Sequence, residues 1–513
     1  MIKKISKNFG LVVLTILLVV KAVAMVALIA QGCLDLAPDE AQYWTWSQHL
    51  DWGYYSKPPG IAWQIWASSQ LFGNGELGVR FGAVVMAAAL SLAVYFCGRC
   101  CGLQDRIAAL AAATMALSPL GMMASLLATT DGGLVLFWTL ALGVLGHSLA
   151  RQETPHYWLV GVFIACGALF KWTIFALWAV IVVGAYFFPR WRKRGIVQGI
   201  AFSLLGLIPS VIWNAKNHWA TFHHVWSTNL SSGGVLGGNF FDFLGAQISL
   251  LSPIVFGLLV IAWMYLVRQR ETPKAMAFCG WSCLVIVAGY AALALVKKIQ
   301  GNWCVYAYPA GCLFVSWYVC EKMRRGKEWL VGGLIVSVMF VAVSLTIPYF
   351  QETNTWSAVK VPYKMNPFRH AVGWKNLENV LSLAGYDPAQ HFIFSDKYQT
   401  TSLLNFYGKE QRRSYFLNIN GCRQNQFCYW PSMAEEQINK TGFFVWIENL
   451  DRLEKHKEEC LVSYRNKLQD FFRRVDFVGE YPIFNAYNQP VKSAFLFRCN
   501  QYNGQIPRAA VSY

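Results

Sequence analysis

Long apolar runs separated by short basic segments are the feature that most constrains the fold of this chain. Runs of roughly the length that spans a bilayer, about 20 residues, predict eleven membrane helices before residue 350. Only 14% of the 513 residues are charged, against about a quarter in an ordinary soluble domain. We therefore predict an α-helical polytopic membrane protein. The runs lie near residues 11–31, 79–98, 107–125, 131–149, 157–171, 172–188, 196–213, 245–267, 276–296, 303–320 and 328–348.

The N-terminal run follows a basic segment, Met1–Lys7, so a cleaved signal peptide is the first alternative to a membrane helix. Its apolar length of about 20 residues is longer than a usual signal core and matches a membrane span. We therefore predict a retained first helix with the N-terminus in the cytoplasm.

The region 157–188 is interrupted by Lys171. A charge at mid-bilayer costs about 3 kcal/mol on insertion scales, so we predict two helices that meet at Lys171 and Trp172. The alternative is one long tilted helix, which would move every later segment to the other side. With the split, seventeen basic residues gather on one face and six on the other, which predicts that the richer face is cytoplasmic. The six periplasmic ones are Lys57, Arg80, Lys171, Lys216, Lys297 and Lys298.

The net charge of +17 does not predict nucleic acid binding. The basic residues fall in short clusters between apolar runs, as the positive-inside bias of membrane proteins requires, and they form no single stripe. We expect membrane lipids, and no nucleic acid, among the partners. The class is thus a multi-pass membrane protein.

The pattern changes after about residue 350. Apolar runs shorten to strand length at 391–395, 414–418, 442–447 and 494–498, with helical patterns at 374–384 and 461–474. We predict a membrane domain, 1–350, and an α/β domain, 351–513, which an odd number of helices places in the periplasm. Four cysteines in this domain allow three pairings; we favour Cys422–Cys428 with Cys460–Cys499.

Charge is crowded in the first outer loop, residues 32–78. Asp39 and Glu40 follow Pro38 and would lie in the first turn of a helix, where acids also serve simply to complement the helix dipole. Tyr43 shares the face of Asp39, whereas Glu40 points about 100° away and is expected to support the site. Lys57 precedes two prolines that hold it on a stiff, extended segment.

Later outer loops add further candidates. Asp131 follows two threonines before a helix, a position that an ordinary N-cap would also explain. Lys297 and Lys298 open a later span and could contact either a ligand or lipid headgroups. Three outer acids could bind a divalent cation, but their spacing does not decide this, so metal dependence stays open.

A carboxylate and cations at the outer surface suit a sugar carried on a lipid phosphate. The phosphate leaves as an anion, which needs cations and no general acid. The incoming acceptor needs at most one base. In-line displacement puts base and cations on opposite sides of the sugar, and Asp39 and Lys57 can supply that pair. No nucleotide-binding fingerprint is evident.

Four motifs in this order resemble the protein O-mannosyltransferase-like family of membrane glycosyltransferases (GT-C type), in particular the bacterial branch that includes the aminoarabinose transferase of lipid A modification. They are Asp39-Glu40, Lys57-Pro58-Pro59, Val79-Arg80-Phe81 and Thr129-Thr130-Asp131. The resemblance covers roughly residues 1–350. It implies a GT-C-like membrane fold with an outer α/β domain and an undecaprenyl-type polyprenyl-phosphate sugar donor. The implied reaction is inverting transfer of a hexosyl or pentosyl group to lipid A or another envelope lipid, glycan or protein. This reaction requires no cofactor.

By this resemblance Asp39 corresponds to the catalytic acid, Asp131 to a second loop acid and Lys57 to a contact of the donor phosphate. Gln42 departs from the pattern, because aminoarabinose transferases usually carry arginine there, which puts that particular donor in doubt. The candidate site therefore consists of the catalytic acids Asp39, Glu40 and Asp131 and the donor-phosphate contacts Lys57, Tyr43, Arg80, Lys297 and Lys298.

Two other classes compete with an enzyme. A transporter or lipid flippase without glycosyl transfer would usually place charges near mid-membrane in paired halves, and neither feature is visible here. A scaffold protein with an outer binding domain is the third hypothesis. Analysis of lipid-linked sugars after incubation with the protein would separate the enzyme from both.

Overall fold

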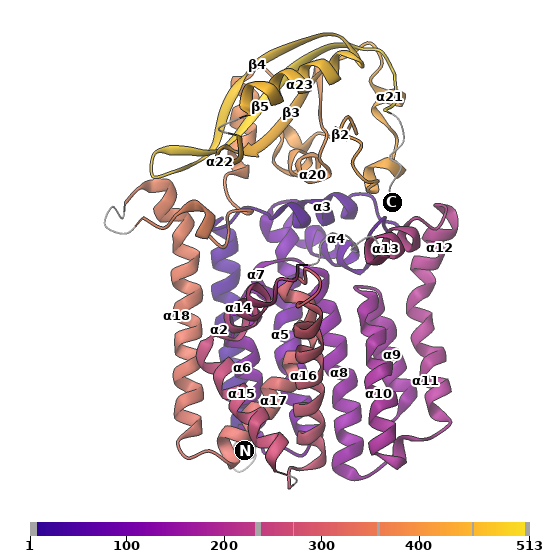
Figure 1. Cartoon of the computed structure of the whole chain (residues 1–513), viewed down its shortest axis with the longest axis vertical. Coiled ribbons are helices and arrows are strands. Elements are labelled where there is room, and N and C mark those ends of the chain that lie inside the picture. Colours follow the sequence, from indigo (N-terminus) through magenta and orange to yellow (C-terminus); the bar gives the residue numbers. More distant parts are fainter. Residues whose placement is uncertain (1–7, 231–236, 270, 356–359, 454–455, 508–513) are drawn as a thin grey trace.

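The computed structural model describes residues 8–230, 237–269, 271–355, 360–453 and 456–507. Figure 1 shows two layers: an upright bundle of helices and, beyond one end of it, a sheet domain formed by the C-terminal part of the chain. The short helices α3 (Pro38–Ser47) and α4 (Gly60–Phe72) lie between the layers. The first outer loop is therefore in contact with both.

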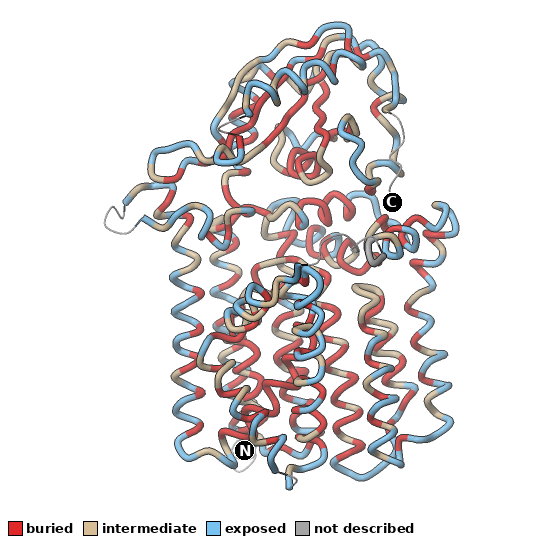
Figure 2. The backbone as a smooth tube through the Cα atoms, in the orientation of Figure 1, coloured by how far each residue is buried: buried red, intermediate tan, exposed pale blue. Residues whose placement is uncertain are grey.

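All eleven predicted membrane segments are helical, and seven stretches are long and apolar enough to cross a membrane. Exposed side chains on these helices are largely apolar, as helices facing lipid require. Figure 2 shows that exposed residues lie along the flanks of the bundle. The protein is thus a multi-pass membrane protein. The seven are α2 (Phe9–Ala30), α5 (Glu76–Cys100), α8 (Thr130–Arg151), α11 (Gly195–Leu204) continued by α12 (Ile208–Lys216), α16 (Lys274–Leu293), η4 (Gly301–Ala307) continued by α17 (Tyr308–Glu321), and α18 (Gly326–Thr353).

Two further pairs of helices are bent. α6 (Asp105–Leu117) meets α7 (Pro119–Leu126) at 59°, and α14 (Phe240–Leu251) meets α15 (Pro253–Arg268) at 104°. Each second helix begins with a proline, which lacks an N–H and clashes with the preceding turn, so the first helix cannot continue through it. Counting each pair as one span gives nine spans among the described residues.

The remaining predicted segments are α9 (Tyr157–Ala168) and α10 (Ala176–Phe187), each of 12 residues. Lys171 lies in the break between them, so the predicted split of 157–188 is confirmed. Both helices are short for a span, and the structure supports seven to nine spans by length and composition. The predicted total of about eleven stays a prediction.

The C-terminal domain is built on a five-stranded sheet of order β2-β1-β3-β5-β4. The parallel strands β1 (His391–Ser395), β2 (Ser414–Phe416) and β3 (Thr441–Asn449) confirm three predicted strands, and β5 (Gln489–Tyr502) contains the fourth. The edge strand β4 (Phe472–Ala486) was missed, and the predicted helix 461–474 runs into it. Its outward charges, such as Arg473 and Arg474, hide the alternation of a strand.

Helices of the C-terminal domain pack on the apolar core of the first outer loop. Leu36, Trp46 and Ile61 of the loop share one apolar cluster with Leu377 of α19 (Leu377–Leu383) and Leu403 of α20 (Tyr398–Tyr407). Because the two regions exclude water from the same apolar side chains, displacing the outer domain would expose the core of the loop. The outer domain therefore helps to fix the loop.

All fourteen cysteines are free thiols in this structure. The favoured pairs, Cys422–Cys428 and Cys460–Cys499, are therefore absent. Cys499 is buried in β5, in the same apolar cluster as the half-buried Cys460, so packing accounts for both residues without a disulfide.

Candidate active site

Glu40 holds the start of α3 in place. As the third residue after Ala37, its carboxylate accepts a hydrogen bond from the Ala37 N–H at 2.9 Å, which caps the helix. The same carboxylate accepts the Ala128 N–H at 2.9 Å. Glu40 thus ties the helix to the segment that leads into α8.

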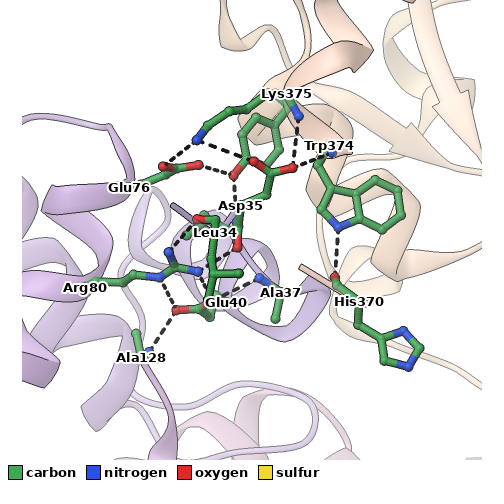
Figure 3. A network of polar contacts seen from close by, with 12 residues as sticks. Leu34, Asp35, Ala37, Glu40, Glu76, Arg80, Ala128, His370, Trp374 and Lys375 are labelled. Carbon is green, nitrogen blue, oxygen red and sulfur yellow. Dashed lines mark hydrogen bonds and ion pairs between the residues drawn. The ribbon is translucent and has the colours of Figure 1, made fainter. Parts of the chain in front are cut away.

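Arg80, at the start of α5, forms a two-pronged ion pair with Glu40, with N–O distances of 2.9 and 2.7 Å. The guanidinium also donates to the carbonyls of Leu34 at 2.8 Å and Asp35 at 2.7 Å, as Figure 3 shows. The Arg80 and Glu40 side chains are 1% and 2% exposed. These contacts leave neither residue open to a ligand, which argues against the expected phosphate contact of Arg80 and the expected catalytic role of Glu40.

A second polar cluster joins this loop to the outer domain. The Asp35 carboxylate accepts the Trp374 N–H at 2.6 Å, and the Lys375 ammonium lies 3.4 Å from Asp35 and 3.1 Å from Glu76. The Tyr407 hydroxyl donates to Glu76 at 2.6 Å. Figure 3 shows that the cluster continues from the Glu40–Arg80 pair. The loop that carries Asp39 is therefore fixed both to the membrane bundle and to the outer domain.

Asp39 differs from Glu40 in having no partner. Within the described residues its carboxylate accepts no hydrogen bond and forms no ion pair. Asp39 is partly exposed to solvent. The surrounding protein still desolvates it, so burial raises the pKa of Asp39; Lys57 and Arg423 oppose that shift through their charge. An unpaired carboxylate of raised pKa is suited to accept a proton.

Lys57 lies near Asp39 on a tight turn. Its backbone pairs with that of Tyr54 in an antiparallel bridge, with N–O distances of 3.1 and 3.4 Å, and the two following prolines stiffen the segment. In the described part of the chain the ammonium forms no ion pair. Burial lowers the pKa of Lys57, and the charge of Lys171 adds to this effect, whereas Asp131 and Asp39 oppose it.

Asp131 lies in the first turn of α8. One carboxylate oxygen accepts from the Lys171 ammonium at 2.7 Å, and the other accepts from the Asn302 amide at 2.8 Å. Lys171 comes from the break between α9 and α10, and Asn302 from η4. The break in the helix thus places a cation beside Asp131 and Lys57, at the end of the bundle nearest the outer domain.

Of the remaining predicted residues, Tyr43 lies in the site, whereas Lys297 and Lys298 do not. Tyr43 is buried, and burial together with the charges of Asp39 and Asp131 raises the pKa of its hydroxyl, which places it beside both acids. Lys297 and Lys298 are exposed and make no ion pair among the residues that the structure describes, so they are not part of this cluster. No group of three or more His, Cys, Asp or Glu side chains within the described ranges is arranged to hold a metal.

Sequence reasoning missed two residues of the outer domain. Arg423 acts as a charge on Asp39, on Lys57 and on the hydroxyl of Tyr398, the first residue of α20. More than 340 residues separate Arg423 from the first outer loop, and no local motif marks it. The sequence did draw attention to Lys171 at the break of the helix, but it gave this residue no role in the site.

The chain is similar to known membrane glycosyltransferases in sequence and in fold. Residues 56–213 match the family model of dolichyl-phosphate-mannose-protein mannosyltransferases. A curated relative, the lipid A galacturonosyltransferase RgtD of Rhizobium johnstonii, is 29% identical over 318 residues, which cover 60% of this chain and 65% of the relative. The chain thus matches just under two thirds of that relative's length.

Among solved structures, ArnT from Cupriavidus metallidurans bound to undecaprenyl phosphate matches with a TM-score of 0.64 and 13% identity, covering 94% of this chain and 97% of that one. The same enzyme in its apo state matches with a TM-score of 0.61 and 13% identity, over the same shares of the two chains. The fold is therefore that of a GT-C membrane glycosyltransferase. The predicted resemblance to this family's bacterial branch is confirmed, and the comparisons favour it over the transporter alternative.

Proposed function

We propose that this protein is an inner-membrane glycosyltransferase that moves a sugar from a polyprenyl-phosphate donor to lipid A or another envelope acceptor at the periplasmic face. The observation that carries the proposal is the Asp39 carboxylate beside the Lys57 ammonium, both without an ion-pair partner among the described residues and both at the junction of membrane bundle and outer domain. The solved structure of ArnT contains undecaprenyl phosphate, which supports this choice of carrier. The relative RgtD is a lipid A galacturonosyltransferase, which supports this choice of acceptor.

In the proposed reaction Asp39 takes the proton from an acceptor hydroxyl, whose oxygen attacks the anomeric carbon. The bond from that carbon to the phosphate oxygen breaks, and the polyprenyl phosphate leaves with the electron pair. Lys57 stabilises the charge that develops on the phosphate, since a fixed cation in a desolvated site acts strongly on a departing anion. Attack opposite the leaving group inverts the anomeric configuration.

Asp131 and Lys171 have a supporting role in this proposal. Their ion pair, at 2.7 Å, neutralises Lys171 while keeping it close to Lys57. Lys57 therefore carries the net positive charge that the phosphate meets. We further propose that no resident cofactor is needed, because Lys57 supplies the charge that a divalent cation would provide.

Transfer by purified protein in lipid nanodiscs tests the proposal. Thin-layer analysis should show loss of a polyprenyl-phosphate sugar and release of polyprenyl phosphate with wild-type protein, and neither with Asp39→Asn. Wild-type-like turnover by that variant would remove Asp39 from its role. Chelation with EDTA should leave the rate unchanged; a loss that added Mg²⁺ or Mn²⁺ restores would contradict the proposed independence from metal.

A further inference from the structure

The outer domain contributes a cation to the candidate active site that the reaction proposed above does not use. Arg423 lies on the segment Gly421–Trp430, between strands β2 and β3. Among the described residues its guanidinium forms no ion pair, and its charge acts on the Tyr398 hydroxyl. A charged group at such a site without a counter-ion is open to an anionic ligand.

The segment that carries Arg423 is anchored to the loop that carries Lys57. The buried Gln426 side chain accepts the Tyr55 N–H at 2.7 Å. The rings of Tyr55 and Tyr429 lie 5.9 Å apart, and Tyr429 also packs on Trp213 at 5.5 Å. Arg423 is thus held by the fold on the side of Asp39 and Lys57, and its exposed side chain can turn to a ligand there.

The balance of charge indicates what this cation is for. Lys171 and Asp131 neutralise each other at 2.7 Å. Lys57 is left for the donor phosphate, and α3 itself contains no basic residue. Asp39 is the base, so its charge is lost when it takes a proton. The positive charge of Arg423 is therefore additional to the charge that one donor phosphate and one base require.

We propose, on the basis of the function proposed above, that Arg423 forms a second anion site, which binds a carboxylate or phosphate group other than the phosphate that carries the sugar. A planar guanidinium matches both groups through paired hydrogen bonds. The anion comes either from a carboxylate on the transferred sugar, as in a uronic acid, or from a phosphate on the acceptor.

Paired substrates test this proposal in nanodisc-held full-length protein. One pair of polyprenyl-phosphate donors carries glucuronic acid or glucose; one pair of lipid A acceptors is phosphorylated or dephosphorylated. Arg423→Gln should raise KM about ten- to a hundredfold for one anionic substrate while leaving its neutral partner within twofold. The affected pair identifies the source of the anion. Arg423→Lys should recover part of the loss, because it keeps the charge without the planar geometry.

Arg465→Gln, an exposed arginine on α23 (Lys457–Gln469), is the matched control and should change neither pair. Equal KM effects on charged and neutral substrates, or none in either pair, would overturn the second anion site. Binding measured without turnover separates this outcome from failure of the proposed function. In this binding measurement the same donors or acceptors are titrated into protein without the co-substrate. Wild-type protein should bind the anionic member of one pair more tightly than its neutral partner. Arg423→Gln should abolish that preference. Absence of any preference in wild type contradicts the second site even if no transfer is detected.

Discussion

Asp39 and Lys57 act on each other's charge across the junction between the membrane bundle and the outer domain, yet their side chains form no direct ion pair. Glu40, the next residue along α3 and about 100° away around the helix, is paired with Arg80 at 2.7 Å. Two adjacent acids thus have different environments. One is free to react, and the other holds the helix.

The pH dependence of transfer should show the titration of both Asp39 and Lys57. Asp39 must be deprotonated to act as base, and burial raises its pKa, so activity should fall on the acid side at a pH above that expected for an ordinary aspartate. Lys57 must be protonated, and burial lowers its pKa, so the alkaline fall should begin below the range of an ordinary lysine. Rate against pH, measured at saturating and limiting donor, checks both limbs.

Lys57→Arg is the matched variant for the alkaline limb. Arginine keeps the charge but does not lose its proton in this range, so the alkaline fall should move to higher pH while the acid limb stays in place. An unchanged alkaline limb would show that another group titrates there.

Asp131→Asn should lower the pKa of Lys57 further. The carboxylate of Asp131 currently opposes the fall in that pKa, and its loss also frees the Lys171 charge nearby. The alkaline limb should therefore shift to lower pH. Asp51→Asn, which changes an exposed acid in the same outer loop, should leave the limb unchanged.

Asp39→Asn should reduce the rate of transfer about a hundred- to ten-thousandfold, the usual contribution of a general base. Its carboxylate has no hydrogen bond or ion pair with the residues that the structure describes, so thermal unfolding should occur within a few degrees of wild type. A large loss of stability in this variant would mean that the rate reports on unfolding.

Arg80→Met should destabilise the protein by about 3–5 kcal/mol, because it leaves the buried Glu40 carboxylate without its counter-ion. The double variant Glu40→Gln with Arg80→Met should recover part of this loss, since no buried charge remains. Chemical unfolding in detergent gives the comparison. Equal stability of the single and double variants would contradict a direct coupling of the two side chains.

Lys375→Met provides a contrast within the same polar cluster. Its side chain is 45% exposed and contacts Asp35 and Glu76 at 3.4 and 3.1 Å. Ion pairs open to water contribute about 1 kcal/mol or less, so this variant should be close to wild type in stability. A loss as large as that of Arg80→Met would show that the outer domain depends on this contact for docking.

The sequence by itself determined the helical segments, the break at Lys171, the change to an α/β domain and the importance of the first outer loop. These features depend on the length and period of apolar runs and on the cost of a charge in lipid, which act locally along the chain. Asp39, Lys57, Tyr43 and Asp131 could be selected because they lie close to predicted helix ends on one face of the membrane.

The tertiary structure alone decided how these charges are paired. Glu40 and Arg80 are 40 residues apart and form a buried ion pair. Asp39 lies in the same helical turn but has no such partner in the described part of the chain. Arg423 reaches the site only because the outer domain packs on the loop through a shared apolar core. Pairing and burial depend on which distant segments meet, and the local sequence pattern carries no information about that.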